Sequence, residues 1–438
     1  MMKKIALTAL LLACASPLAL ALDAVAARQD IDRFLDGKYP GLDRLYKDLH
    51  QHPELGFQEY RTAKVLADAM RKLGFTVTEK VGKTGIVAIY RNGAGPTVMV
   101  RSELDALPMQ EKTGLPYAST QKTKDQDGRE TFVAHSCGHD LHMASWVGTA
   151  ATLVSLKDKW KGTLMFVAQP AEEELSGARS MVDDALFSKF GKPDYAFALH
   201  TAPMEYGYLT YKAGPQTSNG DSFALVFKGK GGHGSMPERT IDPIVIGARF
   251  VTDVQSLVSR EVPPNRFGVV SVGAFNAGTV GNIIPDEAVL LGTVRTYDPG
   301  VRTQLLNGIR RIALASAQAA NAPAPDISIG TSQADAVLND AALTDRTAKV
   351  FKSAFGDKAI QAQEPSPASE DFSVFVEHGI PSLYFMIGVF SSTQLKDWAA
   401  RGQPVPGNHS PFFAPVPEPS IRTGVTAMSL AVMNVMQP

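Results

Sequence analysis

The chain has 438 residues, of which 44% are hydrophobic and 20% are charged, and its formal net charge at pH 7 is -1. This length exceeds what one hydrophobic core normally supports, so we expect two domains. The balanced charge, and the absence of a basic run with interleaved aromatic residues, argue against binding to nucleic acid or to an anionic membrane. The composition is otherwise that of an ordinary globular protein.

The first residues are typical of an export signal. Two lysines precede an apolar run that ends at Leu20, and small residues lead up to Ala21. The run is short for a membrane-spanning helix, and nothing later in the sequence looks transmembrane. We expect residues 1–21 to be a signal peptide cleaved after Ala21, and the mature protein to be periplasmic or secreted. The alternative is a lipoprotein signal at residues 11–14, which would anchor the protein through an acylated Cys14.

The chain has two cysteines, Cys14 and Cys137. If the first is removed with the signal, the second has no intramolecular partner. A lone thiol in an oxidising compartment is open to oxidation unless something occupies it. Metal ligation would protect it, which favours a metal site at Cys137.

The first half of the mature chain alternates between helical and strand patterns. Helices are predicted at 31–50, 59–73 and 143–156, strands at 75–78, 85–90, 97–101, 163–168 and 195–199, and a polar loop at 121–130. The last two strands are almost continuously apolar, as expected in the middle of a sheet covered on both faces. The alternation predicts a mostly parallel sheet flanked by helices.

From about Tyr211 the pattern changes to two strand–helix–strand halves, which suggest a small ferredoxin-like α+β domain. Its predicted strands are 223–228, 267–274, 288–297 and 326–330, and its helices are 244–259 and 301–319. Helices at 342–355 and 419–433 and a strand at 383–388 then resume the first pattern. The simplest architecture is a larger α/β domain in two parts, residues 28–211 and 326–438, interrupted by an inserted domain, residues 212–325.

Residues 135–142 contain three imidazoles, one thiol and one carboxylate. Cys137 and His139, two residues apart, suit a transition metal such as zinc or manganese far better than magnesium or calcium. Gly138 between them allows the tight turn that would point both side chains at one position. The alternative is a buried free cysteine beside two solvated histidines.

Three consecutive glutamates, 172–174, follow the predicted strand 163–168. A two-metal hydrolase needs one carboxylate bound to metal and another, unligated, that accepts a proton from water. Adjacent residues at the end of a strand can point in different directions and so divide these roles. The alternative is a solvated acidic run.

His200 follows the predicted strand 195–199, and His409 lies in a Gly-Asn-His-Ser-Pro segment. Singly, each is more often a structural histidine than a ligand. Together with Cys137, His139 and one glutamate they give five ligands, which is enough for two metals with open positions for water and substrate.

Several motifs occur in the order seen in one family. They are His52–Glu59, Leu104–Pro108, His135–Asp140, Gln169–Glu173, Gly231–Pro237 and Ser369–Phe372. The chain resembles the M-20 family of dimetal amidohydrolases, in particular the hippurate hydrolases, auxin-conjugate hydrolases and bacterial aminoacylase/carboxypeptidases. The resemblance covers nearly all of the mature chain. It implies a zinc-peptidase-like catalytic domain interrupted by a lid and dimerisation domain, and hence a homodimer or higher homo-oligomer.

The resemblance also implies roles for the residues around the metals. The implied ligands of the metal pair are Cys137, His139, Glu173, His200 and His409. Glu172 is the implied general base, which takes a proton from water and returns it to the leaving amine. Asp105 is the implied carboxylate that orients a ligand imidazole, as metal-bound histidines usually require.

Three further residues of the inserted domain take implied roles toward the substrate. His233 would help to stabilise the oxyanion, often at a neighbouring subunit's site. Asn282 and Arg295 would hold the polar end of the substrate, and the guanidinium fork suits a carboxylate. For these last two, an ordinary turn residue and an ordinary strand-surface residue are the alternatives.

Three positions depart from the usual family pattern: Glu174 replaces a glycine, Leu141 a small residue and Glu103 an aspartate. None of them removes an implied ligand or the base. The expected function is therefore that of an exported amidohydrolase with two divalent metals, zinc or manganese with cobalt possible, acting on N-acyl amino acids or short peptides. The alternatives are a metal-stabilised binding protein with a decayed site and a single-metal hydrolase.

Overall fold

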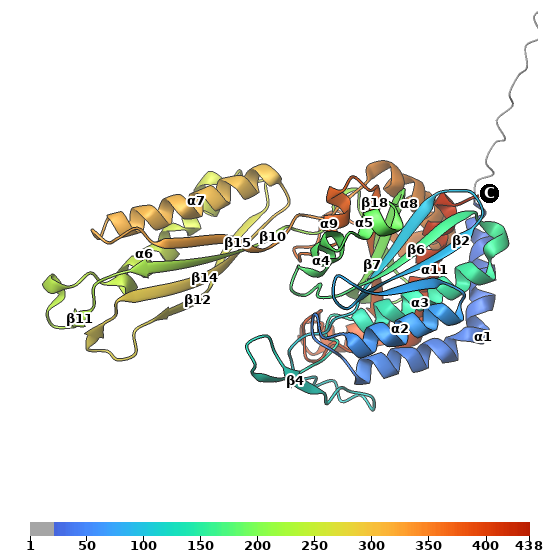
Figure 1. The fold of residues 1–438 in the computed structure, drawn as a ribbon, viewed down its shortest axis with the longest axis horizontal. Helices are drawn as coiled ribbons and strands as arrows, with labels where there is room; N and C mark the ends of the chain where they lie inside the picture. The colour runs from blue at the N-terminus through green and yellow to red at the C-terminus, as the bar shows by residue number, and fades with distance from the viewer. Residues whose placement is uncertain (1–21) are drawn as a thin grey trace, which may run out of the picture.

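The structure, a computed structural model, describes residues 22–438, with the backbone alone at 331–333. The predicted signal peptide and Cys14 lie outside the described residues. The described residues form two main sheets, each with its own helices, and three two-stranded ribbons (Figure 1). In the part that the structure describes, no helix combines the length and the apolar character needed to cross a bilayer.

The larger sheet has eight strands in the order β1-β2-β6-β3-β7-β18-β8-β17. Their bounds are β1 Thr76–Val81, β2 Gly85–Asn92, β3 Thr97–Glu103, β6 Gly162–Gln169, β7 Tyr195–Glu205, β8 Leu209–Tyr211, β17 Ala359–Gln361 and β18 Ser382–Phe390. The four central strands β6, β3, β7 and β18 pair in parallel, and the antiparallel pairs lie toward the edges. The predicted mostly parallel α/β sheet is therefore confirmed.

Helices cover both faces of this sheet (Figure 1). One face carries α1 Ala24–Gln51, α2 Tyr60–Lys72, α3 His139–Ser155, α8 Ala341–Phe355 and α11 Pro417–Val435. The other carries α4 Gly177–Asp183, α5 Leu186–Phe190 and α9 Ser373–Glu377, and α10 (Ser392–Ala400) packs near the edge of the sheet. Because neither face meets water, the central strands are buried at most positions.

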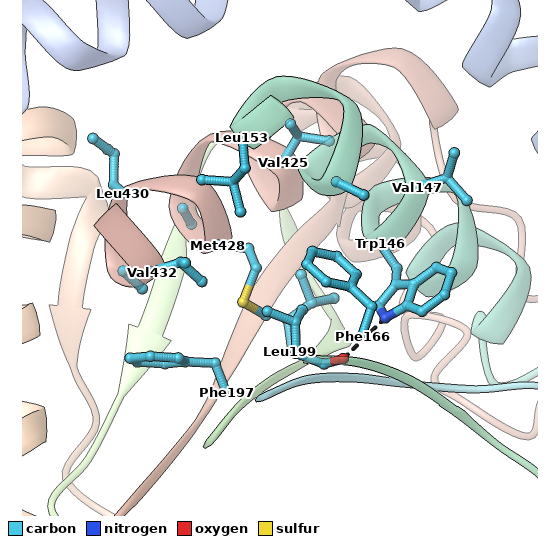
Figure 2. Close-up of a cluster of buried hydrophobic side chains, with 14 of the residues drawn as sticks. Trp146, Val147, Leu153, Phe166, Phe197, Leu199, Val425, Met428, Leu430 and Val432 are labelled. Carbon is cyan, nitrogen blue, oxygen red and sulfur yellow. Dashed lines mark hydrogen bonds between the residues drawn. The ribbon is translucent and has the colours of Figure 1, made fainter. Parts of the chain in front are cut away.

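Figure 2 shows the core between α3, α11 and the sheet. Side chains of α3 and α11 pack over Phe166 and Phe197 of the strands, and Trp146 donates a 3.0 Å hydrogen bond to the Val100 carbonyl. Helix α11 is buried from Ser420 to Val435 almost without interruption, its small polar side chains together with its apolar ones. Truncating a fully buried aromatic such as Phe166 to alanine typically costs about 3–5 kcal/mol.

The smaller unit follows the predicted ferredoxin-like β-α-β-β-α-β order. Its elements are β10 Gly220–Lys228, α6 Pro243–Asp253, β12 Gly268–Ala277, β14 Glu287–Thr296, α7 Pro299–Gln318 and β15 Asp326–Ala334. The strands form an antiparallel sheet in the order β12-β14-β10-β15, and α6 and α7 pack against one face. Both helices begin with an aspartate N-cap followed by proline, Asp242-Pro243 and Asp298-Pro299, which defines their starts in the sequence.

The topology corrects one predicted boundary. Strand β15 pairs with β10, which confirms that the predicted strand 326–330 belongs to the small sheet, so the insert extends beyond its predicted limit at residue 325. The chain enters the small sheet at Gly220 and leaves it after Ala334. The short pair β9 (Gly214–Pro215) and β16 (Leu338–Asn339) joins the two crossing segments.

Several element limits also differ from the sequence prediction. Helix α1 begins at Ala24 rather than residue 31, because Asp23 caps it through the backbone N–H of Ala26. The predicted polar loop 121–130 contains a hairpin, β4 (Lys122–Lys124) and β5 (Glu130–Phe132), which projects from the larger unit (Figure 1). The predicted helix 244–259 ends at Asp253 and is followed by a π-helical turn, Leu257–Glu261.

A buried ion pair links α1 to the start of α3. His50 Nδ1 lies 2.6 Å from Asp140 Oδ2, and His50 Nε2 lies 3.1 Å from Glu111 Oε1, with all three side chains almost fully buried. Burial alone opposes the charged imidazole, but the hydrogen bonds to Asp140 and Glu111 raise the pKa of His50 to about 10. The cation holds Asp140, and with it the first turn of α3, against α1.

We expect this stabilisation to be lost at alkaline pH. The pKa of His50 is raised from 6.5 to about 10 in the fold, so its contribution is complete below pH 6.5 and disappears as the pH rises through 10. The melting-temperature difference between wild type and His50→Gln should be largest near about pH 6 and shrink toward about pH 10. A difference that stayed constant or grew over this range would contradict a charged His50.

Candidate metal centre

The loop before α3 brings Cys137 and His139 to one position. Gly138, between them, is the N-cap of α3 with φ 92°, a left-handed conformation that favours glycine. A Cβ there would also lie 2.7 Å from Thr201 Oγ1, so the loop packs directly on β7. Cys137 and His139 are both buried.

The other predicted ligands converge on the same position from three segments. Glu173 lies in the turn after β6, His200 lies on β7, and His409 lies in the loop before α11. His200 Nε2 is 3.3 Å from Cys137 Sγ, and His409 Nε2 is 3.2 Å from Glu173 Oε2. His139 Nε2 is 3.8 Å from Glu173 Oε1. The five side chains named from the sequence therefore form one cluster.

The sequence predicts that His200 follows the end of its strand. The structure instead places His200 within β7. Strand β7 continues to Glu205, because it pairs with β18 on one side over that length. On its other side, β7 pairs with β3 only as far as Ala198. His200 therefore lies just past the point where the β3–β7 pairing ends, which opens space for its side chain beside Cys137.

The tautomers of two imidazoles are set by backbone carbonyls. His139 Nδ1 donates to the Asp105 carbonyl at 2.8 Å, and His200 Nδ1 donates to the Thr201 carbonyl at 2.8 Å. Each ring therefore presents the Nε2 lone pair to the cluster, which is the arrangement of a metal-binding histidine. The Asp105 carboxylate contributes from further away, with Oδ1 3.5 Å from His139 Nδ1 and Oδ2 accepting the backbone N–H of Glu173 at 2.9 Å.

The donor atoms fit two divalent transition metals. Cys137, His139 and His200 form one group whose ligand atoms lie within 4.8 Å of one another, and Cys137, Glu173 and His409 form another. His139 Nε2 and Glu173 Oε1 are buried, and neither has a hydrogen-bond partner. Buried polar atoms normally have one, so these orphaned atoms are what a metal site requires. Sulfur, imidazole and carboxylate donors together suit zinc or another transition metal.

The electrostatics of the cluster also favour a cation. Burial, Glu173 and Glu172 raise the pKa of the Cys137 thiol, so its thiolate needs positive charge beside it. Burial alone would lower the pKa of His139, but Asp105, Glu103 and Glu173 raise it to about 10. The position is therefore built to hold positive charge, either as a proton or as a metal ion.

His142, the third imidazole of the motif, has no lone pair to offer a metal. Its Nδ1 donates to Glu103 Oε2 at 2.9 Å, and its Nε2 accepts the backbone N–H of Thr201 at 2.9 Å. It is a structural residue that holds β7 against α3. Glu103, one of the departures from the family pattern, forms this contact and also pairs with Arg101.

Glu172 is buried beside the cluster. Its Oε2 lies 3.6 Å from His139 Nε2. Burial, Glu370, Glu173 and Asp371 raise its pKa well above the usual range for a carboxyl group. A carboxyl group so placed can hold and release a proton, which is what a general acid–base requires.

A fully buried Arg101 lies beneath Glu172. Its guanidinium donates to Gln169 Oε1 at 2.9 Å and to Glu370 Oε1 at 2.7 Å, and it also pairs with Asp371 and Glu103. Sequence reasoning did not anticipate this network. The available signal was Arg101 itself, a charge at the end of the predicted strand 97–101, where burial would require a partner.

Two further contacts join the loops of the cluster, and sequence reasoning also missed them. Asn408 Nδ2 donates to the Cys137 carbonyl at 2.8 Å and to Thr201 Oγ1 at 3.0 Å. The His409 backbone N–H donates to the Ser136 carbonyl at 2.8 Å, and His409 has a left-handed φ of 67°. These bonds fix His409 relative to Cys137 although the two are distant in sequence.

A cavity of about 360 Å³ opens over the cluster. Its lining includes Glu172, the ligand candidates Cys137, Glu173, His200 and His409, and Arg295 of β14. The Arg295 guanidinium donates to Ser369 Oγ, so the small unit contributes one cation to the wall of the cavity. The α/β fold, the metal-ligand cluster and a spare buried carboxyl group define the class of protein as a metal-dependent hydrolase.

The structure does not bring His233 and Asn282 to this cavity. Both lie at the β11–β13 ribbon (Gly232–His233 with Ile283–Ile284), at the end of the small unit far from the larger sheet (Figure 1). They are close to each other, because the Gly234 N–H donates to the Asn282 carbonyl at 2.8 Å. Within one chain, therefore, Arg295 lines the cavity, whereas His233 and Asn282 do not.

Comparison with known proteins identifies the family. The model described as Peptidase family M20/M25/M40 matches residues 99–433. Campylobacter jejuni hippurate hydrolase is 38% identical over 341 residues, 76% of this chain and 85% of that protein. Bacillus subtilis N-acetylcysteine deacetylase is 35% identical over 355 residues, 79% of this chain and 88% of that protein.

A solved structure agrees with these relatives. The Bacillus subtilis YXEP protein, described as a dinuclear metal binding peptidase from the M20 family, is 28% identical, with a TM-score of 0.73. The match covers 92% of this chain and 99% of that one. The chain belongs to the M20/M25/M40 peptidase family, and it is an amidohydrolase/metallopeptidase.

Gly177→Ala should disturb the glutamate loop and weaken metal binding. A Cβ at this position would lie 1.5 Å from the Pro170 carbonyl oxygen, so the loop carrying Glu172 and Glu173 must open to accept it. We expect a loss of roughly 3 kcal/mol in stability, measured by denaturant unfolding, together with a lower metal content.

Gly37→Ala is the matched control, because a Cβ there meets nothing within 4 Å inside α1. It should be neutral or stabilise the protein by up to about 1 kcal/mol. Equal effects of the two substitutions would contradict the close approach of the loop to Pro170.

Proposed function

We propose that the protein is an exported amidohydrolase with two divalent metals that cleaves the amide bond of N-acyl amino acids or short peptides. The observation that carries the proposal is the cluster itself. Five donor side chains converge on two adjacent groups that share Cys137, and Glu172 lies beside them without being needed as a ligand. The relatives named above support the reaction class, since one acts on hippurate and one on N-acetylcysteine.

Cys137, His139, Glu173, His200 and His409 would hold the metals, with zinc, manganese or cobalt as candidates. When bound, two such ions supply Lewis acidity that polarises the amide carbonyl and makes water a better nucleophile at neutral pH. Glu172 accepts the proton from the attacking water and returns it to the departing nitrogen. Its burial keeps bulk water from competing for that proton.

Arg295 is proposed to bind the free carboxylate of the substrate. Its guanidinium lies on the cavity wall, and in the described residues it takes part in no ion pair within 4.0 Å. A bidentate guanidinium–carboxylate contact would fix which end of the substrate enters the cavity. His233 and Asn282 would complete the site only from a second copy of the chain or after closure of the small unit, so we propose a homodimer or higher homo-oligomer.

The direct test is to restore metal and measure activity. The mature protein, stripped with chelator and reloaded with zinc, manganese or cobalt, should release free amino acid from a panel of N-acyl amino acids and dipeptides. Activity should reach its maximum at about two metals per chain. Maximal activity at one metal would favour a single-metal hydrolase, and tight metal binding with no hydrolysis would favour a binding protein. The intact mass after export distinguishes cleavage after Ala21 from acylation at Cys14.

Glu172→Gln should separate metal binding from turnover. The amide cannot accept the proton, so kcat should fall by about 10²–10⁴-fold while the metal content stays near that of the wild type. The neighbouring substitution Glu173→Gln removes a proposed ligand and should lower the metal content itself. Near-normal turnover in a metal-loaded Glu172→Gln protein would refute the role of Glu172.

A further inference from the structure

We infer that Glu174 is a specificity-determining residue that makes the acyl side of the site favour a positively charged acyl group over an anionic one. The chemical class favoured is the peptide with a free amino terminus, whose acyl half carries an ammonium group. This inference rests on the proposed function and adds a substrate preference to it.

Two hollows meet at the proposed metal ligand Glu173. The first is the cavity over the cluster, and the second is a hollow of about 460 Å³ beneath the β4–β5 hairpin. Glu173 lines both of them. The second hollow is also lined by Asp105 and Glu174, and its apolar wall consists of Leu55, Ala106, Leu107 and Pro108. A substrate bound at the cluster therefore has space on two sides.

The chemistry decides which half of the substrate enters which hollow. Glu172, which must deliver a proton to the departing nitrogen, lines the first cavity and not the second. Arg295, the proposed receptor for the carboxylate of the amino acid, also lines only the first. The leaving amino acid thus occupies the first cavity, and the acyl half points toward the second hollow.

The second hollow has an excess of negative charge. Its charged side chains are Asp105, Asp125, Asp127, Glu173, Glu174 and Arg129. Arg129 is already paired with both Asp125 and Asp127 of the hairpin. Asp105 is 1% exposed and faces His139, with its Oδ1 3.5 Å from the ring Nδ1, so it adds negative charge to the wall without offering an accessible oxygen. A cationic group entering this hollow would meet carboxylates without displacing a paired arginine, whereas an anionic group would be repelled.

Glu174 is the member of this set that the fold holds in place for such a contact. Its carboxylate is hydrogen-bonded to Gln126 of the hairpin. Its Oε1 packs so closely on Gly56 that a Cβ there would lie 2.7 Å away. The next residue, Leu175, has a left-handed φ of 51° and lines the first cavity instead. Consecutive residues of one loop thus face different halves of the substrate, and Glu174 stands where the family pattern has glycine.

The test compares three substrates with the same leaving amino acid, chosen as the best one in the panel. Their acyl groups are glycyl, which is cationic, propionyl, which is its neutral isostere, and malonyl, which is anionic. The metal-loaded wild type should give the highest kcat/KM with glycyl and the lowest with malonyl. In Glu174→Gln the glycyl-to-propionyl ratio should fall by about fivefold, the size expected for one partly exposed charge pair, and the malonyl substrate should improve.

Two further variants separate charge from structure. Glu130→Gln removes one negative charge from the β4–β5 hairpin at a residue that does not line the hollow, and should leave all three ratios unchanged. Gly56→Ala keeps the charge but displaces the Glu174 carboxylate, and should reproduce the loss of preference. Melting temperatures identify any variant that is poorly folded, and the wild-type ratios test the inference without any variant.

The outcomes distinguish this inference from the proposed function. Hydrolysis with a wild-type preference for malonyl, or with ratios that Glu174→Gln leaves unchanged, overturns the role of Glu174 and leaves the amidohydrolase proposal intact. If the protein loaded with two metals cleaves no amide at all, both fall together.

Discussion

The structure depends on how it balances the negative charge that is buried near the carboxyl ends of the central strands of the larger sheet. Glu103, Glu172, Glu370 and Asp371 are all nearly inaccessible to water, and Glu173 lies just above them. Arg101 neutralises the lower part of this group with a guanidinium that has no exposed surface. Desolvated charges are costly unless they are paired, so one arginine cannot satisfy them all. The negative charge of the upper part, around Cys137 and Glu173, remains for metal cations to balance. This determines where the candidate metal centre lies.

The parallel sheet explains how ligands so distant in sequence meet. Strands β3 and β6 end side by side, and their following loops carry Asp105 and the glutamate pair. Strand β7 passes the same level and presents His200, and α3 begins there with His139. Loops that follow parallel strands converge at one edge of a sheet, which is where sites form in open α/β folds. Asn408 and Thr201 then bind the last loop to the first.

The small unit contributes one side chain to the wall of the cavity. It places Arg295 on the cavity wall through β14, the strand next to β10 at the point where the chain crosses between the units. His233 and Asn282, at its far end, remain away from the cluster (Figure 1). The five candidate metal ligands, by contrast, all lie in the larger unit.

The sequence by itself determined the fold class, the approximate elements and the residues of the cluster, because these depend on local patterns. Apolar periodicity, N-caps such as Asp298, and short motifs of sulfur, imidazole and carboxylate groups are all readable along the chain. It did not determine where the inserted domain ends, that residues 121–130 contain a hairpin, or that β7 continues past His200. These features depend on which strands pair with one another in the folded chain. Only the tertiary structure decided which imidazoles have a free lone pair. Glu103 and the Thr201 N–H engage both ring nitrogens of His142. In His139 and His200, by contrast, a backbone carbonyl binds Nδ1 and leaves the Nε2 lone pair open.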